Sequence, residues 1–323
     1  MRRRRVLAVV AALAVWPSFT HAQTAGSPAV VAILSGGSLL PEARESWLQG
    51  LSELGLSEGR DFKVVLLSTE GDQQRTPALV TAVVALNPAV VVTNSTGLTL
   101  ELRRATDSIP IVAVAITDAV GAGLATSYAR PGGNVTGLAA SASSPGKVLE
   151  LLLEIVPGVT RVGLLFNPDN LGNVLGVRAV KEEMAGLPIA LIEVAARTPA
   201  DIEPAFQEAA RAMVGALVIM QDPVYTRQTQ LIADLALSAR LPTGAGFEVH
   251  SEAGSLMSYG ASLRERYRRV GWYVGQILWG RKPGDLPIEQ MAKLKLVINL
   301  KTAKTLGLAI PQSILARADE VIE

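Results

Sequence analysis

The chain has 323 residues, of which 49% are hydrophobic, 18% charged and 4% aromatic, a composition that suits one large or two ordinary globular domains and excludes a disordered chain. The formal net charge is +1, but without the four arginines Arg2–Arg5 there are 26 basic and 29 acidic residues, and this net charge of −3 argues against a nucleic-acid partner. Because cysteine is absent and histidine occurs twice, disulfides, thiolate chemistry and histidine-rich metal sites are excluded.

The first 22 residues predict a secretory signal peptide. Arg2–Arg5 form a basic start, and Val6–Trp16 is an apolar run of 11 residues, too short to cross a bilayer comfortably. Cleavage is expected after Ala22, which places the mature chain in the periplasm. An uncleaved N-terminal anchor is the alternative, and Arg4-Arg5 is a weak match to a twin-arginine export signal.

After the signal peptide, short apolar runs alternate with segments in which apolar residues recur every three or four positions. Strands that are apolar on both faces and alternate with helices are typical of a parallel sheet covered by helices. A similar series begins again after residue 144, so the sequence predicts two α/β lobes. The predicted strands are Ala29–Leu34, Phe62–Leu67, Ala89–Thr93, Ile111–Ile116, Val135–Leu138, Arg161–Phe166, Ala190–Val194, Gly215–Met220, Ser255–Gly260 and Leu294–Leu300, and Ile314–Glu323 is predicted to be a terminal helix.

The glycine-rich stretch Ala129–Ala140 does not match a nucleotide-binding loop. A P-loop requires G-x-x-x-x-G-K-[ST], and Gly146-Lys147 lacks both the earlier glycine and the following hydroxyl residue. A dinucleotide fingerprint requires three glycines after the first strand, where Ser35–Ser38 has two. Pro131–Asn134 is instead predicted to be a turn that leads into a strand and then into the linker Ala139–Ser144. No cofactor is expected.

Several stretches together resemble the tryptophan/tyrosine-type substrate-binding proteins of bacterial ABC transporters, and the resemblance covers nearly the whole mature chain. It implies an α/β fold of the type I periplasmic binding kind, with two flavodoxin-like (Rossmann-like) lobes, parallel sheets, a three-crossover hinge and a ligand cleft between the lobes. The expected boundaries are 23–139 plus 256–283 for lobe 1 and 140–255 plus 284–323 for lobe 2. The stretches that carry the resemblance are Gly50–Phe62, Ile116–Leu138, Met257–Gly260, Leu296–Pro311 and Arg317–Glu323.

The resemblance implies an extracytoplasmic solute-binding protein, not an enzyme, that captures a small ligand by hinge closure and delivers it to an ABC permease at the membrane. An amino acid or a related small carboxylate is the expected ligand, and the protein is expected to be a monomer without a metal. A binding component that reports to a sensor is an alternative. An α/β enzyme is a further alternative, but no nucleophile, base or metal cluster emerges for it.

In the first lobe, polar residues follow the predicted strands. Ligands of doubly wound sheets bind at the carboxyl ends of the strands, so these residues are expected at the cleft. Hydroxyls and free amides that precede helices can hold a carboxylate, and plain helix capping is the alternative role. The candidates are Ser35, Ser38, Asn94, Ser95, Thr96 and Asp118.

In the second lobe, Asn167 and Asn170 follow a predicted strand, with an Asx turn around Pro168 as the alternative. Asp222 is expected to pair with a ligand ammonium, because a charge-assisted contact in a closed cleft is strong. Its alternative is a turn before Pro223. Tyr225 is expected to supply an apolar wall, and Glu248 to lie near the next strand end, where solvation at the hinge edge competes with ligand contact.

Overall fold

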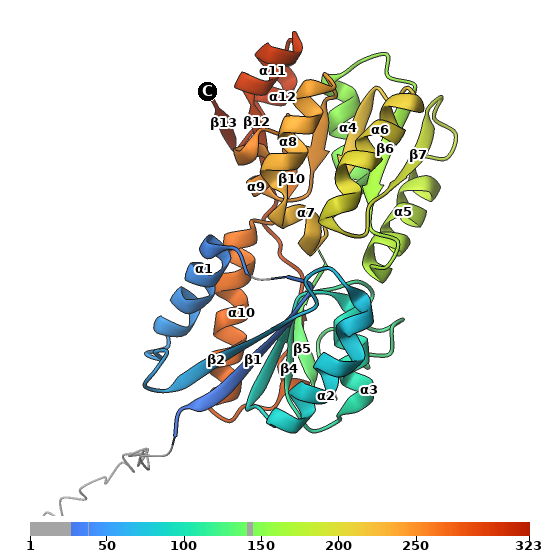
Figure 1. Ribbon diagram of the computed structural model, residues 1–323. Coiled ribbons are helices and arrows are strands. Elements are labelled where there is room, and N and C mark those ends of the chain that lie inside the picture. Colours follow the sequence, from blue (N-terminus) through green and yellow to red (C-terminus); the bar gives the residue numbers. More distant parts are fainter. Residues whose placement is uncertain (1–26, 38, 141–144) are drawn as a thin grey trace, which may run out of the picture.

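The computed structural model describes residues 27–37, 39–140 and 145–323. The predicted signal peptide, the candidate Ser38 and residues 141–144 of the predicted linker lie outside these ranges. The described strands form two sheets, and each sheet with its helices makes one lobe (Figure 1).

The first lobe is built on a sheet with the strand order β11-β5-β4-β3-β1-β2, in which neighbouring strands are parallel. Its strands are apolar on both sides because helices cover both faces. The elements are β1 (Ala29–Ser35), α1 (Pro41–Ser52), β2 (Phe62–Ser68), η1 (Gln73–Arg75), α2 (Thr76–Leu86), β3 (Val90–Thr93), α3 (Thr96–Ala105), β4 (Ile111–Ile116), β5 (Val135–Ala139), α10 (Leu263–Leu278), η3 (Pro283–Asp285) and β11 (Ile288–Glu289).

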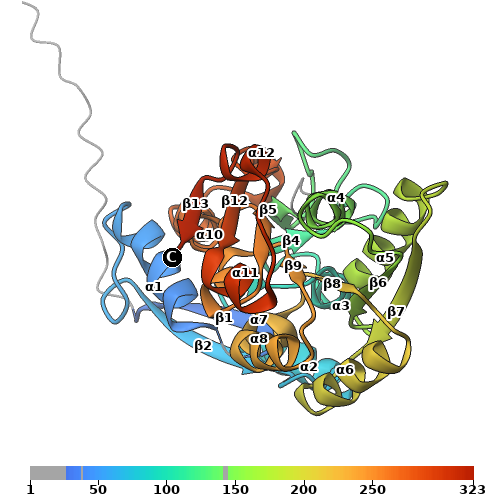
Figure 2. The same cartoon turned by 90° about the horizontal axis from the view of Figure 1, so that it is seen from above.

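The second lobe contains a sheet with the order β13-β12-β10-β9-β8-β6-β7, which Figure 2 shows from β13 at one side to β7 at the other. Only the pair β10–β12 is antiparallel among the described pairings of this sheet. The elements are α4 (Pro145–Ile155), β6 (Arg161–Phe166), α5 (Leu171–Glu183), β7 (Ala190–Ala195), η2 (Pro199–Asp201), α6 (Ile202–Arg211), β8 (Ala216–Ile219), α7 (Pro223–Arg227), α8 (Thr229–Ser238), β9 (Thr243–Ala245), α9 (Glu248–Ala253), β10 (Met257–Gly260), β12 (Lys295–Asn299), α11 (Leu300–Leu306), α12 (Gln312–Leu315) and β13 (Glu320–Ile322).

The described strands place three crossovers between the sheets, between β5 and α4, between β10 and α10, and between β11 and β12. This arrangement corrects two of the expected lobe boundaries. β10 pairs with β9 and β12 and so belongs to the second sheet, although 256–283 was assigned to lobe 1. β11 pairs with β5 in the first sheet, although 284–323 was assigned to lobe 2. Both strands are short, and their partner strands rather than their own patterns decide which sheet they join.

The C-terminal segment differs from its prediction as well. The expected helix over Ile314–Glu323 is wrong, because α12 ends at Leu315 and β13 then pairs in parallel with β12. Asp319 starts this pairing. Its backbone N–H donates to the carbonyl of Leu296 (2.8 Å), and its carboxylate accepts from the N–H of Leu296 (2.8 Å). The apolar residues of such a short segment do not distinguish a strand from a helix.

Glycine allows α1 and α10 to pack closely on one face of the first sheet, where they lie side by side (Figure 1). A Cβ at Gly271 would collide with the carbonyl oxygen of Trp47, and a Cβ at Gly50 would collide with that of Arg268. The two glycines therefore let the backbones of α1 and α10 approach more closely than any residue with a Cβ would allow.

The glycine-rich stretch forms the predicted strand, since β5 covers Val135–Ala139, while the preceding residues 131–134 are irregular with a bend at 133–134. Gly137 has a φ of 126°, and a Cβ there would collide with the backbone of Ala113 in β4, where the register of the two strands shifts. Glycine is required at this position by the backbone rather than by a ligand.

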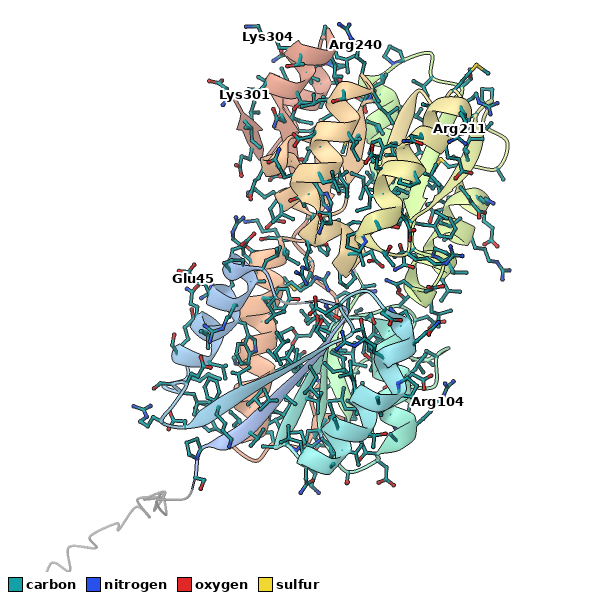
Figure 3. All side chains as sticks on the ribbon, in the orientation of Figure 1. Glu45, Arg104, Arg211, Arg240, Lys301 and Lys304 are labelled. Carbon is teal, nitrogen blue, oxygen red and sulfur yellow. The ribbon has the colours of Figure 1, made fainter. Side chains whose placement is uncertain are left out.

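Charged side chains gather at the periphery. Arg104, Arg211, Lys301 and Lys304 extend away from the lobes (Figure 3), while apolar side chains fill the space between sheets and helices. Among the described residues, no helix combines the length and the apolar character needed to cross a membrane.

Candidate ligand-binding site

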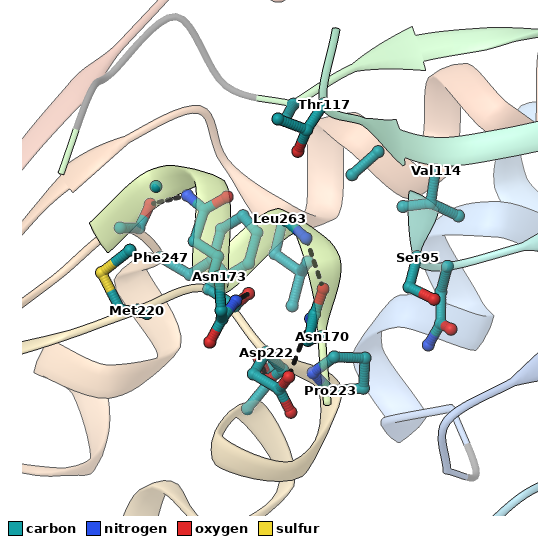
Figure 4. Close-up of a pocket in the computed structure, with 18 of the residues that line it drawn as sticks. Ser95, Val114, Thr117, Asn170, Asn173, Met220, Asp222, Pro223, Phe247 and Leu263 are labelled. Atoms are coloured by element: carbon teal, nitrogen blue, oxygen red, sulfur yellow. Dashed lines mark hydrogen bonds between the residues drawn. The ribbon is translucent and has the colours of Figure 1, made fainter. Parts of the chain in front are cut away.

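A cavity of about 480 Å³ lies between the two lobes, a size typical of small-molecule sites. The first lobe contributes the residues that follow β3 and β4 and the start of α10. The second lobe contributes the N-terminal ends of α5 and α7 and the end of β8 (Figure 4). A molecule in this cavity is therefore in reach of both lobes at once.

Asn94, Ser95 and Thr96 follow β3 and line the cavity, as the sequence predicted for their positions. Each is also held within its own lobe. Asn94 Nδ2 donates to Ser35 Oγ (2.7 Å), and Ser95 Oγ accepts from the N–H of Leu98 (3.3 Å) at the start of α3. Thr96 Oγ1 accepts from the backbone N–H of Thr117, which follows β4, at 2.9 Å. Helix capping and cavity lining thus occur together here.

Ser35 and Asp118 occupy different positions relative to this cavity. Ser35 is fully buried behind Asn94 and accepts from the N–H of Gly37 (3.2 Å), so the structure does not bring it to the cavity. Asp118 lines the cavity from the first lobe with an exposed side chain. Its carboxylate accepts from the N–H of Gly121 (2.9 Å) within a turn. The helix-capping alternative is wrong for this residue, because no helix lies between β4 and β5.

Asn170 and Asp222 meet on the second-lobe side (Figure 4). Asn170 Oδ1 accepts from the N–H of Gly172 (3.0 Å) and caps α5, while its Nδ2 donates to Asp222 Oδ2 (2.8 Å). The other carboxylate oxygen of Asp222 accepts from the N–H of Val224 (2.8 Å) and caps α7. Both N-caps are thereby joined at one point of the cavity wall.

The carboxylate of Asp222 is buried, with 3% of the residue exposed, and its hydrogen-bond partners are neutral groups. Burial raises the pKa of Asp222, and the hydrogen bonds from Asn170, Val224 and Asn167 only partly oppose this effect. A cationic ligand group beside Asp222 would therefore stabilise the ionised carboxylate.

Three candidates of the second lobe lie off the cavity. Asn167 is buried, its Oδ1 accepts from the N–H of Asp169 (3.0 Å), and it lines a smaller cavity of about 20 Å³ that shares Asp222 with the main one. Tyr225 is fully buried, and its hydroxyl donates to the carbonyl of Ala196 (2.6 Å). Burial raises the pKa of Tyr225, so this hydroxyl stays protonated.

Glu248 is the third of these candidates, and it caps α10. Its carboxylate accepts from Ser262 Oγ (2.6 Å) and from the N–H of Leu263 (3.0 Å). The side chain is buried between α9 and α10 rather than solvated at the edge of the hinge, and it does not line the cavity. Its partners come from a segment 14 or 15 residues away, so the local sequence does not reveal this role.

The walls of the cavity are mostly apolar, and strand-end positions in the sequence did not predict them. Leu263, Arg266 and Tyr267 line it from α10, on the helix face that packs against the strand ends. The available signal was an arginine on an otherwise apolar helical stripe that also includes Val270. Other apolar lining residues are Leu39, Leu40, Val114, Met220 and Phe247.

The lobes also touch at the mouth of the cleft. Arg227 at the end of α7 lies 3.6 Å from Glu70, which follows β2. Gly37 packs under the same arginine, and Gly36 packs against Pro223. These contacts join residues of different lobes, so they depend on the angle between the lobes.

The arrangement suits non-covalent binding of a small molecule. Within the described residues, no group of three or more acidic or histidine side chains is placed to hold a metal ion. The cavity instead combines polar strand ends, a buried carboxylate and apolar walls.

The sequence matches the family described as ABC transporter substrate binding protein over residues 27–322. A curated relative, the tyrosine-binding protein of Clostridioides difficile, is 23% identical over 269 residues, which cover 83% of this chain and 77% of that protein.

Two solved structures are similar to this chain in both sequence and fold. A conserved domain protein from Vibrio cholerae is 30% identical with a TM-score of 0.83, over 91% of this chain and 99% of that one. An ABC domain from Streptococcus pneumonia in complex with L-Trp is 26% identical with a TM-score of 0.80, over 92% of this chain and 100% of that one.

Proposed function

Because this chain belongs to the ABC transporter substrate binding protein family, whose members are extracytoplasmic solute-binding proteins, we propose that it captures an amino acid between its lobes and delivers it to an ABC permease. The observation that carries the proposal is the cavity, which is lined by both lobes and contains the buried carboxylate of Asp222. We further propose that the protein acts as a monomer in the periplasm after removal of residues 1–22. A single chain supplies both walls of the cavity.

The chemistry of the cavity supports an amino acid with a large apolar side chain. Asp222 offers a negative charge to an ammonium group, and Asn170 holds that carboxylate in place. Phe247, Leu263 and Met220 offer apolar surface to a side chain. The names of two relatives agree with this choice, because one is a tyrosine-binding protein and the other is in complex with L-Trp.

Hinge closure is the proposed mechanism. A ligand that contacts both lobes favours the conformation in which they approach each other, and so shifts an equilibrium between open and closed forms. Three crossovers between the sheets allow a rotation of the lobes without any change in strand pairing. The closed form is the one that would dock on the permease.

A thermal-shift screen of the twenty amino acids, followed by titration calorimetry of every hit, tests this function. We expect aromatic or large aliphatic L-amino acids to bind with a dissociation constant on the order of micromolar, about −8 kcal/mol. A correctly folded protein that binds none of them would contradict the proposal.

A further inference from the structure

Arg266 is a fully buried arginine in the wall of the cavity. It lies in the first turn of α10, and its Nη1 donates to the carbonyl oxygens of Val114 (2.8 Å) and Ala139 (2.9 Å). These carbonyls are located at the carboxyl ends of β4 and β5, beside the first crossover. One nitrogen of the guanidinium is thus held by the backbone of the first lobe.

The two other nitrogens, Nε and Nη2, are buried and have no hydrogen-bond partner among residues 27–37, 39–140 and 145–323. In a guanidinium these two form one edge, with parallel N–H groups that match the two oxygens of a carboxylate. Leaving charged donors buried and unpaired costs free energy, and a bound ligand that accepts their hydrogen bonds would remove that cost.

In the part of the chain that the structure describes, no carboxylate accepts a hydrogen bond from Nε or Nη2 of Arg266. Glu248 acts on Arg266 only through its charge, because its oxygens accept from Ser262 and Leu263. Burial lowers the pKa of Arg266 to about 10, which leaves the guanidinium cationic at neutral pH. The first lobe therefore contributes a buried positive charge to the cavity, and Asp222 of the second lobe contributes a buried negative one.

We propose that the Nε and Nη2 edge of Arg266 receives the carboxylate of the ligand, while Asp222 receives its ammonium group. The proposal rests on the amino-acid-binding function above and narrows it to zwitterionic α-amino acids. It differs from the expectation that the hydroxyls and amides before α3 hold the carboxylate. Ser95 and Thr96 accept hydrogen bonds from their own lobe there, whereas Arg266 offers a full charge and two unpaired donors.

This placement connects the ligand with the hinge. Ala139, whose carbonyl accepts from Arg266, ends β5 just before the first crossover, and α10 begins just after the second. A ligand whose carboxylate bonds to Arg266 and whose ammonium bonds to Asp222 contacts both lobes. Both of its charged groups then favour the closed form.

Titration calorimetry with L-tryptophan, L-tryptophanamide and L-tyrosine on wild type and on Arg266→Gln and Arg266→Lys tests the proposal. We expect the wild type to bind L-tryptophan at least about 100-fold more tightly than the amide, which lacks the carboxylate. Arg266→Gln should weaken L-tryptophan and L-tyrosine by a similar factor and change the amide by less than about threefold. Arg266→Lys, which keeps a charge for the two carbonyls, should fold and lose about tenfold, because it lacks the planar edge.

The amide comparison needs no variant and so does not depend on how a variant folds. Equal wild-type affinity for L-tryptophan and its amide would overturn the role of Arg266 and leave the proposed function intact, as would undiminished L-tryptophan binding by a folded Arg266→Lys. Absence of binding by all twenty amino acids would overturn the proposed function and this inference with it.

Discussion

The side-chain amide of Asn170 donates a 2.8 Å hydrogen bond to the carboxylate of Asp222 and so links the N-caps of α5 and α7 in the wall of the cavity. The partner of the carboxylate is neutral, so this bond orients the negative charge without neutralising it. Asp222 therefore has two roles, one in helix capping and one in the charge that the cavity presents. Asparagine can take over the first role but not the second.

Asp222→Asn is expected to stabilise the free protein and to weaken amino-acid binding by about 30-fold or more, the loss typical of removing one partner of a buried charge pair. The folded-state pKa of Asp222 is raised, so its ionised form opposes folding at neutral pH, and that cost fades as the pH falls through the folded pKa. Urea unfolding and calorimetry measure the two effects. Asp72→Asn is the control, because the exposed Asp72 carboxylate caps η1 by accepting from the N–H of Gln74 and does not line the cavity; an equal loss of affinity in both variants would contradict the assignment.

The stability of the protein should depend on His250 in the acid range. Burial lowers the pKa of His250 to about 4 from 6.5, so the unfolded chain takes up a proton at a higher pH than the folded one. The contribution of the neutral imidazole is fully present above pH 6.5 and declines as the pH falls to 4, by about 3 kcal/mol in total. Urea unfolding at several pH values should show a shallower decline for His250→Gln, and parallel curves for the two proteins would refute this prediction.

Gly271→Ala is expected to destabilise the protein by about 1–3 kcal/mol, because the added methyl group collides with the carbonyl of Trp47 and pushes α10 from α1. Chemical unfolding measures this loss. Gly97→Ala is a matched helical control, since nothing lies within 4 Å of its added Cβ, and alanine there should be neutral or slightly stabilising. Similar stability of the two variants would show that the close packing of α1 and α10 is not required.

Arg227→Gln should speed ligand release by up to about fivefold, because the Glu70–Arg227 pair crosses the cleft and a partly exposed pair contributes at most about 1 kcal/mol. The effect should shrink as the salt concentration rises. Stopped-flow measurement of ligand dissociation checks it. Arg178→Gln breaks an ion pair within α5 and should leave the dissociation rate unchanged. If both variants speed dissociation equally, the Glu70–Arg227 pair has no specific role in ligand release.

The sequence predicted the parts of the fold that local patterns determine. β1, β4 and β6 agree with the predicted strands within one residue, because each has an apolar run with proline or a polar residue at its start and a polar residue at its end. β9 is a strand of three residues without such a run, and the segment that contains β13 is apolar in a pattern that also suits a helix. Pairing with distant strands decides these two cases.

The difference between local patterns and distant contacts also explains which cavity residues could be predicted from the sequence. Asn94 and Asp222 were found because they follow strands, and the carboxyl ends of parallel strands meet at the cleft. Tyr225 and Glu248 also stand near strand ends, but partners elsewhere in the chain bind their polar atoms away from the cavity. Arg266 was missed because α10 reaches the strand ends of the first lobe through a crossover from the second.

Small-angle X-ray scattering of the mature protein, with and without a saturating concentration of an amino acid shown by calorimetry to bind, measures whether the two lobes close on the ligand. We expect a smaller radius of gyration in the bound protein, because the ligand draws the two lobes together, and a weaker change for Asp222→Asn at the same ligand concentration. An unchanged radius of gyration at full occupancy would contradict capture by closure of the lobes.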